Sequence, residues 1–83
     1  MPVVAELDGV RIMLYANEHP PPHFHAWFAE HRAVIDIETL TVTEGFLPVA
    51  KRKKVLRWAA TRQDALRRAF IQATSQEKVE PIA

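Results

Sequence analysis

The stretch that decides the fold is HFHAWFAEHRAVIDIE, residues 23–38. Apolar and polar side chains alternate along it with the period of two that a half-buried strand requires. A turn at Glu30-His31 predicts a hairpin, because it leaves a matching strand on either side. This hairpin has four opposing pairs: Ala29 with Arg32, Trp27 with Val34, His25 with Asp36, and His23 with Glu38.

One face of this hairpin is wholly apolar, and the other carries the side chains with chemistry. The apolar face comprises Phe24, Ala26, Phe28, Ala33, Ile35 and Ile37. The opposite face comprises His23, His25, Trp27, Asp36 and Glu38. Because a slip of one residue would mix the two sets, the pattern favours this assignment of faces.

A second hairpin precedes the first, around Asp8-Gly9, since both residue types tolerate the positive φ of a tight hairpin turn. We expect its apolar face to pair Leu7 with Val10, Ala5 with Ile12, and Val3 with Leu14. Its other face pairs Glu6 with Arg11 and Val4 with Met13. The three prolines at 20–22 lack backbone donors, so they predict a stiff, extended entry into the His23 strand.

The C-terminal half reads as helical. A helix is expected from Pro48 to about Ala60, with a buried stripe of Val49, Leu56, Ala59 and Ala60, supplemented by Val55 or Trp58. Thr61-Arg62-Gln63-Asp64 resembles a capping box and predicts a second helix, whose buried face is Leu66, Ala69, Phe70 and Ala73. The tail over residues 76–81 is expected to be extended and to lie along the domain.

These elements predict one α+β domain over residues 1–83. It consists of an N-terminal antiparallel β-meander of two hairpins packed against two C-terminal α-helices. A short fifth strand is expected at Thr41–Thr43, before Gly45. A chain of this size buries a modest core, so a dimer, a partner protein or a metal could add stability.

Charge is distributed unevenly along the chain. Residues 1–50 carry a balance of −5, residues 51–68 carry +7, and the whole chain carries +1. There is no cysteine, which excludes disulfides and thiolate metal sites. The start lacks the pattern of a signal peptide, and no stretch has the apolar length of a membrane span. We therefore expect a cytoplasmic protein without membrane contact.

The histidine strand is the first candidate site. His23 and His25 project the same way from a strand, and Asp36 and Glu38 on the partner strand could add carboxylates. Such a set suits Zn²⁺, Mn²⁺ or Fe²⁺, and His19 could add a further ligand. The alternative is ordinary hydrogen bonding between histidines and carboxylates of a sheet, and this alternative carries the greater weight.

The same residues are the only candidates for catalysis. His25 beside Asp36 could act as an acid–base pair, because a carboxylate fixes the tautomer of an imidazole. No cysteine exists, and the single serine, Ser75, lies far along the chain, so no nucleophile accompanies the pair. An RNA-cleaving toxin would not need a nucleophilic side chain. In such an enzyme a histidine acts as the base, and arginines stabilise the charge on the phosphate.

Two surfaces are candidates for binding. Trp27 on the histidine face would suit a partner contact or base stacking, unless other segments cover it. The second surface is the basic segment with Lys51, Arg52, Lys53, Lys54, Arg57, Arg67 and Arg68. It suits RNA or DNA phosphates, an acidic partner or a second copy of the chain, while a merely solvated helix face is the ordinary alternative.

Several motifs together resemble one known family. They are Asp8-Gly9, Ile12, Tyr15, the block Asn17-Glu18-His19-x-Pro21-Pro22-His23-Phe24-His25, the strand Ala33-x-Ile35-Asp36-Ile37, Leu47-Pro48 and Glu80-Pro81. They are similar to the bacterial domain-of-unknown-function 4160 family over nearly the whole chain. The resemblance implies that Asn17, Glu18 and His19 belong to the same family motif as the strand histidines, and we expect these three to be binding residues. It also implies a small partner protein encoded by a neighbouring gene.

These observations favour a bacterial binding or regulatory protein over an enzyme. We expect one half of a toxin–antitoxin-like two-gene module, which contacts a protein partner and potentially nucleic acid through the basic helices. The alternative is a small metal-dependent or acid–base enzyme centred on His23, His25 and Asp36. A third reading is a structural partner that completes another protein's sheet through an edge strand.

Overall fold

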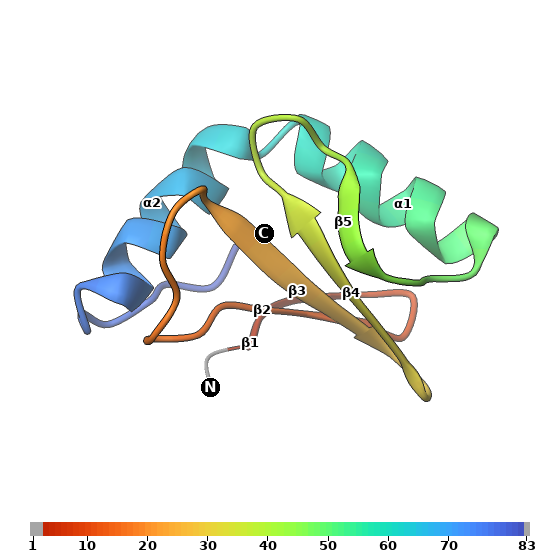
Figure 1. Ribbon diagram of the computed structural model, residues 1–83, viewed down its shortest axis with the longest axis horizontal. Helices are drawn as coiled ribbons and strands as arrows, with labels where there is room; N and C mark the ends of the chain where they lie inside the picture. Colours follow the sequence, from red (N-terminus) through yellow and green to blue (C-terminus); the bar gives the residue numbers. More distant parts are fainter. Residues whose placement is uncertain (1–2, 83) are drawn as a thin grey trace.

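Five strands precede two helices in the computed structural model, which describes residues 3–82. The elements are β1 (Val3–Leu7), β2 (Val10–Met13), β3 (His23–Phe28), β4 (His31–Asp36), β5 (Val42–Gly45), α1 (Val49–Ala60) and α2 (Gln63–Thr74). The strands form one antiparallel sheet in sequence order (Figure 1). The predicted α+β meander with two C-terminal helices is confirmed, and the expected short fifth strand is present as β5.

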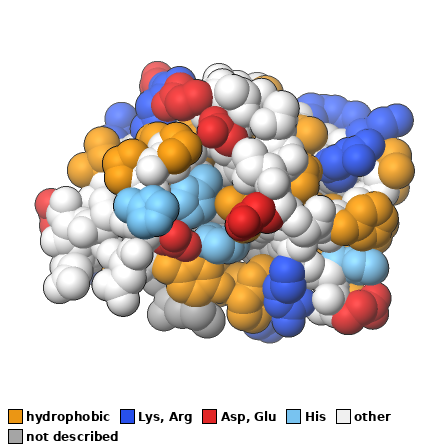
Figure 2. All heavy atoms as spheres, viewed as in Figure 1, with side chains coloured by type: hydrophobic (Ala, Val, Ile, Leu, Met, Phe, Trp, Pro, Cys, Tyr) orange, Lys and Arg blue, Asp and Glu red, His pale blue; other side chains and the backbone are white. Residues whose placement is uncertain are grey.

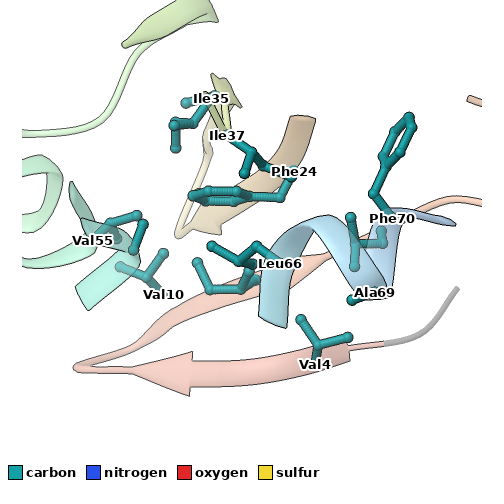
Figure 3. Packing of buried hydrophobic residues seen from close by; sticks show 14 of the residues in the cluster. Val4, Val10, Phe24, Ile35, Ile37, Val55, Leu66, Ala69 and Phe70 are labelled. Carbon is teal, nitrogen blue, oxygen red and sulfur yellow. The ribbon is translucent and has the colours of Figure 1, made fainter. Parts of the chain in front are cut away.

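Both helices cover the same face of the sheet. Phe24 of β3 is fully buried and lies among Ile35, Ile37 and Leu66 at the centre of the core (Figure 3). The predicted buried face of α2 is confirmed in full: Leu66, Ala69, Phe70 and Ala73. The opposite face of the sheet, called the open face below, carries His23, His25 and Trp27, and within residues 3–82 α2 reaches it at His23, where Phe70 contacts the imidazole ring.

The predicted buried stripe of α1 is partly wrong. Val55 and Ala59 are buried, but Val49 is 51% exposed and Ala60 is also exposed. Six residues separate Val49 from Val55, which turns its side chain about 120° around the helix from Val55. Apolar character alone did not reveal which residues of the helix face the sheet.

The capping box proposed for the second helix is also wrong. The Thr61 hydroxyl donates to the Trp58 carbonyl at 3.1 Å, so it serves the end of α1. Arg62 occupies the N-cap position of α2 without a side-chain cap. Instead, the Gln63 side-chain amide donates to the Ile37 carbonyl at 2.8 Å and ties the start of α2 to the segment after β4.

The first hairpin contains a bulge that its sequence did not predict. Leu7 opposes Val10 and Ala5 opposes Ile12, as expected, but Val3 opposes Met13 and not Leu14. The irregularity between Val3 and Ala5 turns Val4 into the core at 2% exposure and leaves Val3 at 46%. The Val4 carbonyl also accepts the Ile82 backbone N–H at 2.7 Å, so the end of the C-terminal tail lies beside β1.

The register of the central hairpin differs from the predicted one by two residues. The turn is Ala29-Glu30, His23 opposes Asp36, and His25 opposes Val34. Ala29 has a φ of 51°, the positive value that tight hairpin turns favour at a central position. A shift of two preserves the alternation, so every side chain stays on its predicted face while the pairs across the strands change.

Ion pairs join the helices to the sheet. Lys51 and Lys54 of α1 approach the same Asp8 carboxylate oxygen at 2.7 and 2.9 Å, so they hold α1 against the β1–β2 turn. Arg67 of α2 donates to both oxygens of Glu38 at 2.6 and 2.8 Å. Part of the negative charge of the sheet half is therefore neutralised by positive charge of the helical half within the same domain.

No helix within residues 3–82 has the length and apolar character needed to cross a membrane. Among the same residues, β5 pairs with β4 on one side only, so it is an edge strand. Exposed edges offer unpaired backbone groups to another strand.

We predict that Gly45→Ala is much more destabilising than Gly9→Ala. Both glycines have positive φ, 77° and 83°, so alanine costs about 1–2 kcal/mol in backbone strain at either site. A Cβ at Gly9 meets only the Phe28 ring at 3.4 Å, whereas one at Gly45 overlaps the Arg32 carbonyl. Overpacking adds about 1–3 kcal/mol at Gly45. Urea unfolding measures both; equal losses would show that β5 does not pack against β4 as described.

A second prediction concerns acid. Hydrogen bonds from Lys51 and Lys54 lower the pKa of Asp8 to about 2 from its usual 3.8. The stabilisation is therefore complete above about pH 5 and is lost as the pH falls toward 2. Asp8→Asn should lower the free energy of unfolding at pH 7 and make no difference near pH 2.

The matched control for this experiment is Glu77→Gln, an exposed carboxylate with no ion pair among residues 3–82. It should leave the stability unchanged at both pH values. A deficit of Asp8→Asn that persists undiminished at pH 2 would contradict the ion-pair account.

Candidate functional site

Three side chains converge on the open face, and we call them the Glu–His–His cluster: Glu18, His23 and His25. Strand alternation places the two imidazoles of β3 on the same side. The loop between β2 and β3 doubles back, so that Glu18 reaches both rings. Histidine side chains gather beside acidic ones in the same region of Figure 2.

Glu18 bridges the two imidazoles with separate oxygens. His25 Nε2 lies 2.6 Å from Glu18 Oε1, and His23 Nε2 lies 3.1 Å from Glu18 Oε2. One ligand atom from each of the three residues lies within 4.8 Å of the others. The exposed fractions of the side chains are 24% for Glu18, 15% for His23 and 19% for His25, so the cluster is half-buried.

Neighbouring groups hold both rings. The Pro21 carbonyl lies 2.8 Å from His23 Nδ1, and the Phe70 ring of α2 packs at 5.4 Å between centroids. Tyr15 contacts His25 edge-on at 4.4 Å. The imidazoles are therefore oriented by packing before any ligand arrives, which is what a binding site needs.

The Glu18 carboxyl is held in its ionised form. Partial burial would raise the pKa of Glu18, but hydrogen bonds from His25 and His23 outweigh it, and the net pKa is lowered. The cluster therefore offers an anionic oxygen together with two ring nitrogens.

The acid–base pair predicted between His25 and Asp36 is not formed. Asp36 opposes His23 in the sheet, and its carboxylate accepts the backbone N–H groups of Glu38 and Thr39 at 2.8 and 2.9 Å. The hydrogen bond from the Thr39 backbone N–H is the main cause of the lowered pKa of Asp36. The shifted turn explains the difference, since it moves Asp36 from His25 to His23.

Glu38 is also outside the cluster, because it binds Arg67 on α2. The hydrogen bond from Arg67 lowers the pKa of Glu38. Of the four predicted metal ligands, the structure brings together His23 and His25, and their carboxylate partner is Glu18. The sequence placed Glu18 among the binding residues without giving it this role.

A surface hollow of about 410 Å³ adjoins the cluster. Its lining combines the loop with β4 and β5: Glu18, His19, Pro21, His23, Val34, Asp36, Thr43 and Glu44. His19 is exposed on its rim, and its Nδ1 is 3.3 Å from the Pro20 carbonyl. Asn17 is exposed in the same loop and does not line the hollow.

Trp27 lies farther along β3, in a row with two arginines. Arg11 on β2 and Arg32 on β4 flank it as its cross-strand neighbours. The Arg32 guanidinium carbon stands 4.0 Å from the Trp27 ring centroid, a cation–π contact. We call these three residues the arginine–tryptophan row. Trp27 was predicted as a contact residue, but the two arginines beside it were not.

The predicted basic surface is partly neutralised within the domain. Lys51 and Lys54 pair with Asp8, and Arg67 pairs with Glu38 and Asp64. Arg62 contacts the Trp58 ring and the Thr61 hydroxyl. Four cations have no carboxylate partner within residues 3–82: Arg52, Lys53, Arg57 and Arg68.

Chemically, the open face offers ligands and contacts. The cluster supplies two imidazoles and a carboxylate, and the row supplies an aromatic ring with the Arg32 guanidinium over it and Arg11 on the neighbouring strand. Within the described residues, no hydroxyl or thiol nucleophile is hydrogen-bonded to either clustered histidine.

The chain was compared with models of known protein families. The model described as "Domain of unknown function (DUF4160)" matches residues 9–70, well over half of the 83-residue chain. The chain belongs to this family. The matched range includes the loop of the cluster, the whole of β3 and both arginines of the row. No curated protein and no solved structure gives a significant match.

Proposed function

We propose that this member of the DUF4160 family is a small binding and regulatory protein that docks an acidic partner protein on the open face of its sheet. The observation that carries the proposal is the arginine–tryptophan row. Its residues line a hollow of about 360 Å³ together with Gly9 and Ala29. The row crosses three strands, so it is fixed by the backbone of the sheet and needs no loop to order it.

The composition of the row is that of an interface centre. Tryptophan and arginine are the residues that most often dominate binding energy in protein interfaces. Arg32 is held in place because its Nη1 donates to the carbonyls of Ala29 and His31 at 2.9 and 3.0 Å. A side chain that is already ordered loses less conformational entropy when a partner binds.

The charge of the row specifies the chemistry of the partner. Neither Arg11 nor Arg32 forms an ion pair with a carboxylate within residues 3–82. A guanidinium matches a carboxylate with two parallel hydrogen bonds. We therefore infer a partner surface with Asp or Glu side chains around an apolar group that covers Trp27.

The partner that we propose is the small protein encoded beside this one, in a two-gene module of toxin–antitoxin type. The family resemblance implies such a neighbour. In this module the protein acts by contact with its partner, which requires only the surfaces described above. A hydrolytic role would also require a reacting group near the cluster.

Nucleic acid is the second candidate ligand. The observation that favours it is the set of four cations on the helices that lack carboxylate partners: Arg52, Lys53, Arg57 and Arg68. Phosphate backbones bind such surfaces in a salt-dependent way. Half of the eight basic side chains over residues 51–68 are already engaged inside the domain, which lowers the charge available for phosphates.

We predict that the arginine–tryptophan row dominates the affinity for the partner. Trp27→Ala or Arg11→Ala should weaken binding of the neighbouring gene's product about 30-fold, as expected for a loss of about 2 kcal/mol at an interface centre. Isothermal titration calorimetry with the two purified proteins measures the change. Arg11 is exposed, so its variant tests the surface even if Trp27→Ala weakens the fold.

The control is the double variant Lys53→Ala/Arg57→Ala, which removes two unpaired cations from α1 and should change the affinity less than about threefold. Absence of a complex, or an equal loss in the control, would overturn docking on the open face. Binding of RNA or DNA that weakens with salt and is lost in the control variant would replace the partner protein with nucleic acid.

A further inference from the structure

The hydrogen-bond roles of His23 point to a cation between the residues of the cluster. The Pro21 carbonyl can only accept, so His23 Nδ1, at 2.8 Å from it, carries a proton. In the neutral imidazole, Nε2 then presents a lone pair. That lone pair faces Glu18 Oε2, another acceptor, at 3.1 Å. A proton on Nε2 turns this contact into the hydrogen bond to Glu18 described above, and a metal ion between the two atoms can take the place of that proton.

We propose that Glu18, His23 and His25 bind one Zn²⁺ ion, with a remaining coordination position open to the adjoining hollow. The Glu–His–His cluster supplies two ring nitrogens and one carboxylate oxygen, a ligand set that zinc accepts in sites with an open position. The chain has no cysteine to compete for the ion. This proposal does not depend on partner docking.

The second coordination sphere fits the proposal. Histidines that bind metals usually donate their other ring N–H to a carbonyl or carboxylate, which fixes the tautomer and orients the ring. The Pro21 carbonyl does this for His23. The packing of Tyr15 against His25 and of Phe70 against His23 limits rotation of both rings.

Only a small movement converts the cluster into a coordination site. Tetrahedral ligands about 2.1 Å from zinc lie about 3.4 Å from one another. The present separations are 2.6 Å from His25 Nε2 and 3.1 Å from His23 Nε2 to the nearer Glu18 oxygen. Glu18 therefore has to retreat by less than about 1 Å from each imidazole, and ligand atoms that now lie within 4.8 Å of one another have to settle at about 3.4 Å.

The hollow provides room for a further ligand. A catalytic-type zinc site keeps one position for water or substrate. Here that position would face a space of about 410 Å³ that Asp36, Thr43 and Glu44 also line. The two acidic residues disfavour an anion in that position.

The test is metal binding by the full chain after removal of adventitious metal with a chelator. We expect one Zn²⁺ per chain by calorimetry, and visible absorption bands of tetrahedral Co²⁺ when cobalt replaces zinc. Glu18→Gln keeps the shape of the side chain and removes its charge, and it should weaken zinc binding at least about 100-fold, as should His25→Ala. Circular dichroism establishes that each variant is folded.

Two other histidines provide matched controls. His19→Ala removes an imidazole from the rim of the hollow, and His31→Ala removes one on β4 that lies outside the cluster. Both should retain the affinity within about threefold. The proposal is overturned if wild-type protein binds zinc no tighter than about 100 µM. It is also overturned if Glu18→Gln binds as tightly as wild type; the cluster is then a hydrogen-bonded carboxylate bridge alone.

Discussion

The antiparallel pairing of β3 with β4 is the constraint on which the rest of the structure depends. Its alternation sends Phe24, Ala26 and Ile35 into the core, where the helices cover them, and places His23, His25 and Trp27 on the open face. The same backbone that buries the apolar layer therefore also aligns the candidate ligands. A slip by one residue would expose the core and bury the imidazoles together, so the stability of the fold determines which face carries the candidate ligands.

Ion pairs determine how much charge remains for binding. The sequence divides into an acidic half and a basic half, and some of their charges pair with each other within the domain. These ion pairs join Asp8 to Lys51 and Lys54, and Glu38 to Arg67. These ion pairs hold the helices against the sheet. Because they are exposed to solvent, each contributes little to the free energy of unfolding. Within residues 3–82, what remains is a set of cations on the helices without carboxylate partners and the two arginines beside Trp27. Of these, Arg32 is held by two backbone carbonyls and the Trp27 ring, which is why we propose docking on the open face.

The sequence predicted the architecture, the faces of the strands and the buried side of α2, because all three follow from periodicity. It missed features that leave periodicity unchanged or interrupt it locally. A two-residue shift of the turn to Ala29-Glu30 preserves every face, and so the pattern could not reveal that His25 opposes Val34. The bulge beside Val4 and the folding back of Glu18 toward the imidazoles are local irregularities in a hairpin and a loop, where no period exists to reveal them. The prolines of the loop between β2 and β3 predicted a stiff segment, but they did not indicate toward which residues the loop would run.

The account rests on the register of the central hairpin, since it determines which acid accompanies which histidine. Nuclear Overhauser effects between backbone protons of the two strands measure this register directly in solution. The account predicts cross-strand contacts of His23 with Asp36 and of His25 with Val34. Contacts of His25 with Asp36 and of Trp27 with Val34 would contradict it, because they would restore the acid–base pair and remove Trp27 from its place beside Arg32.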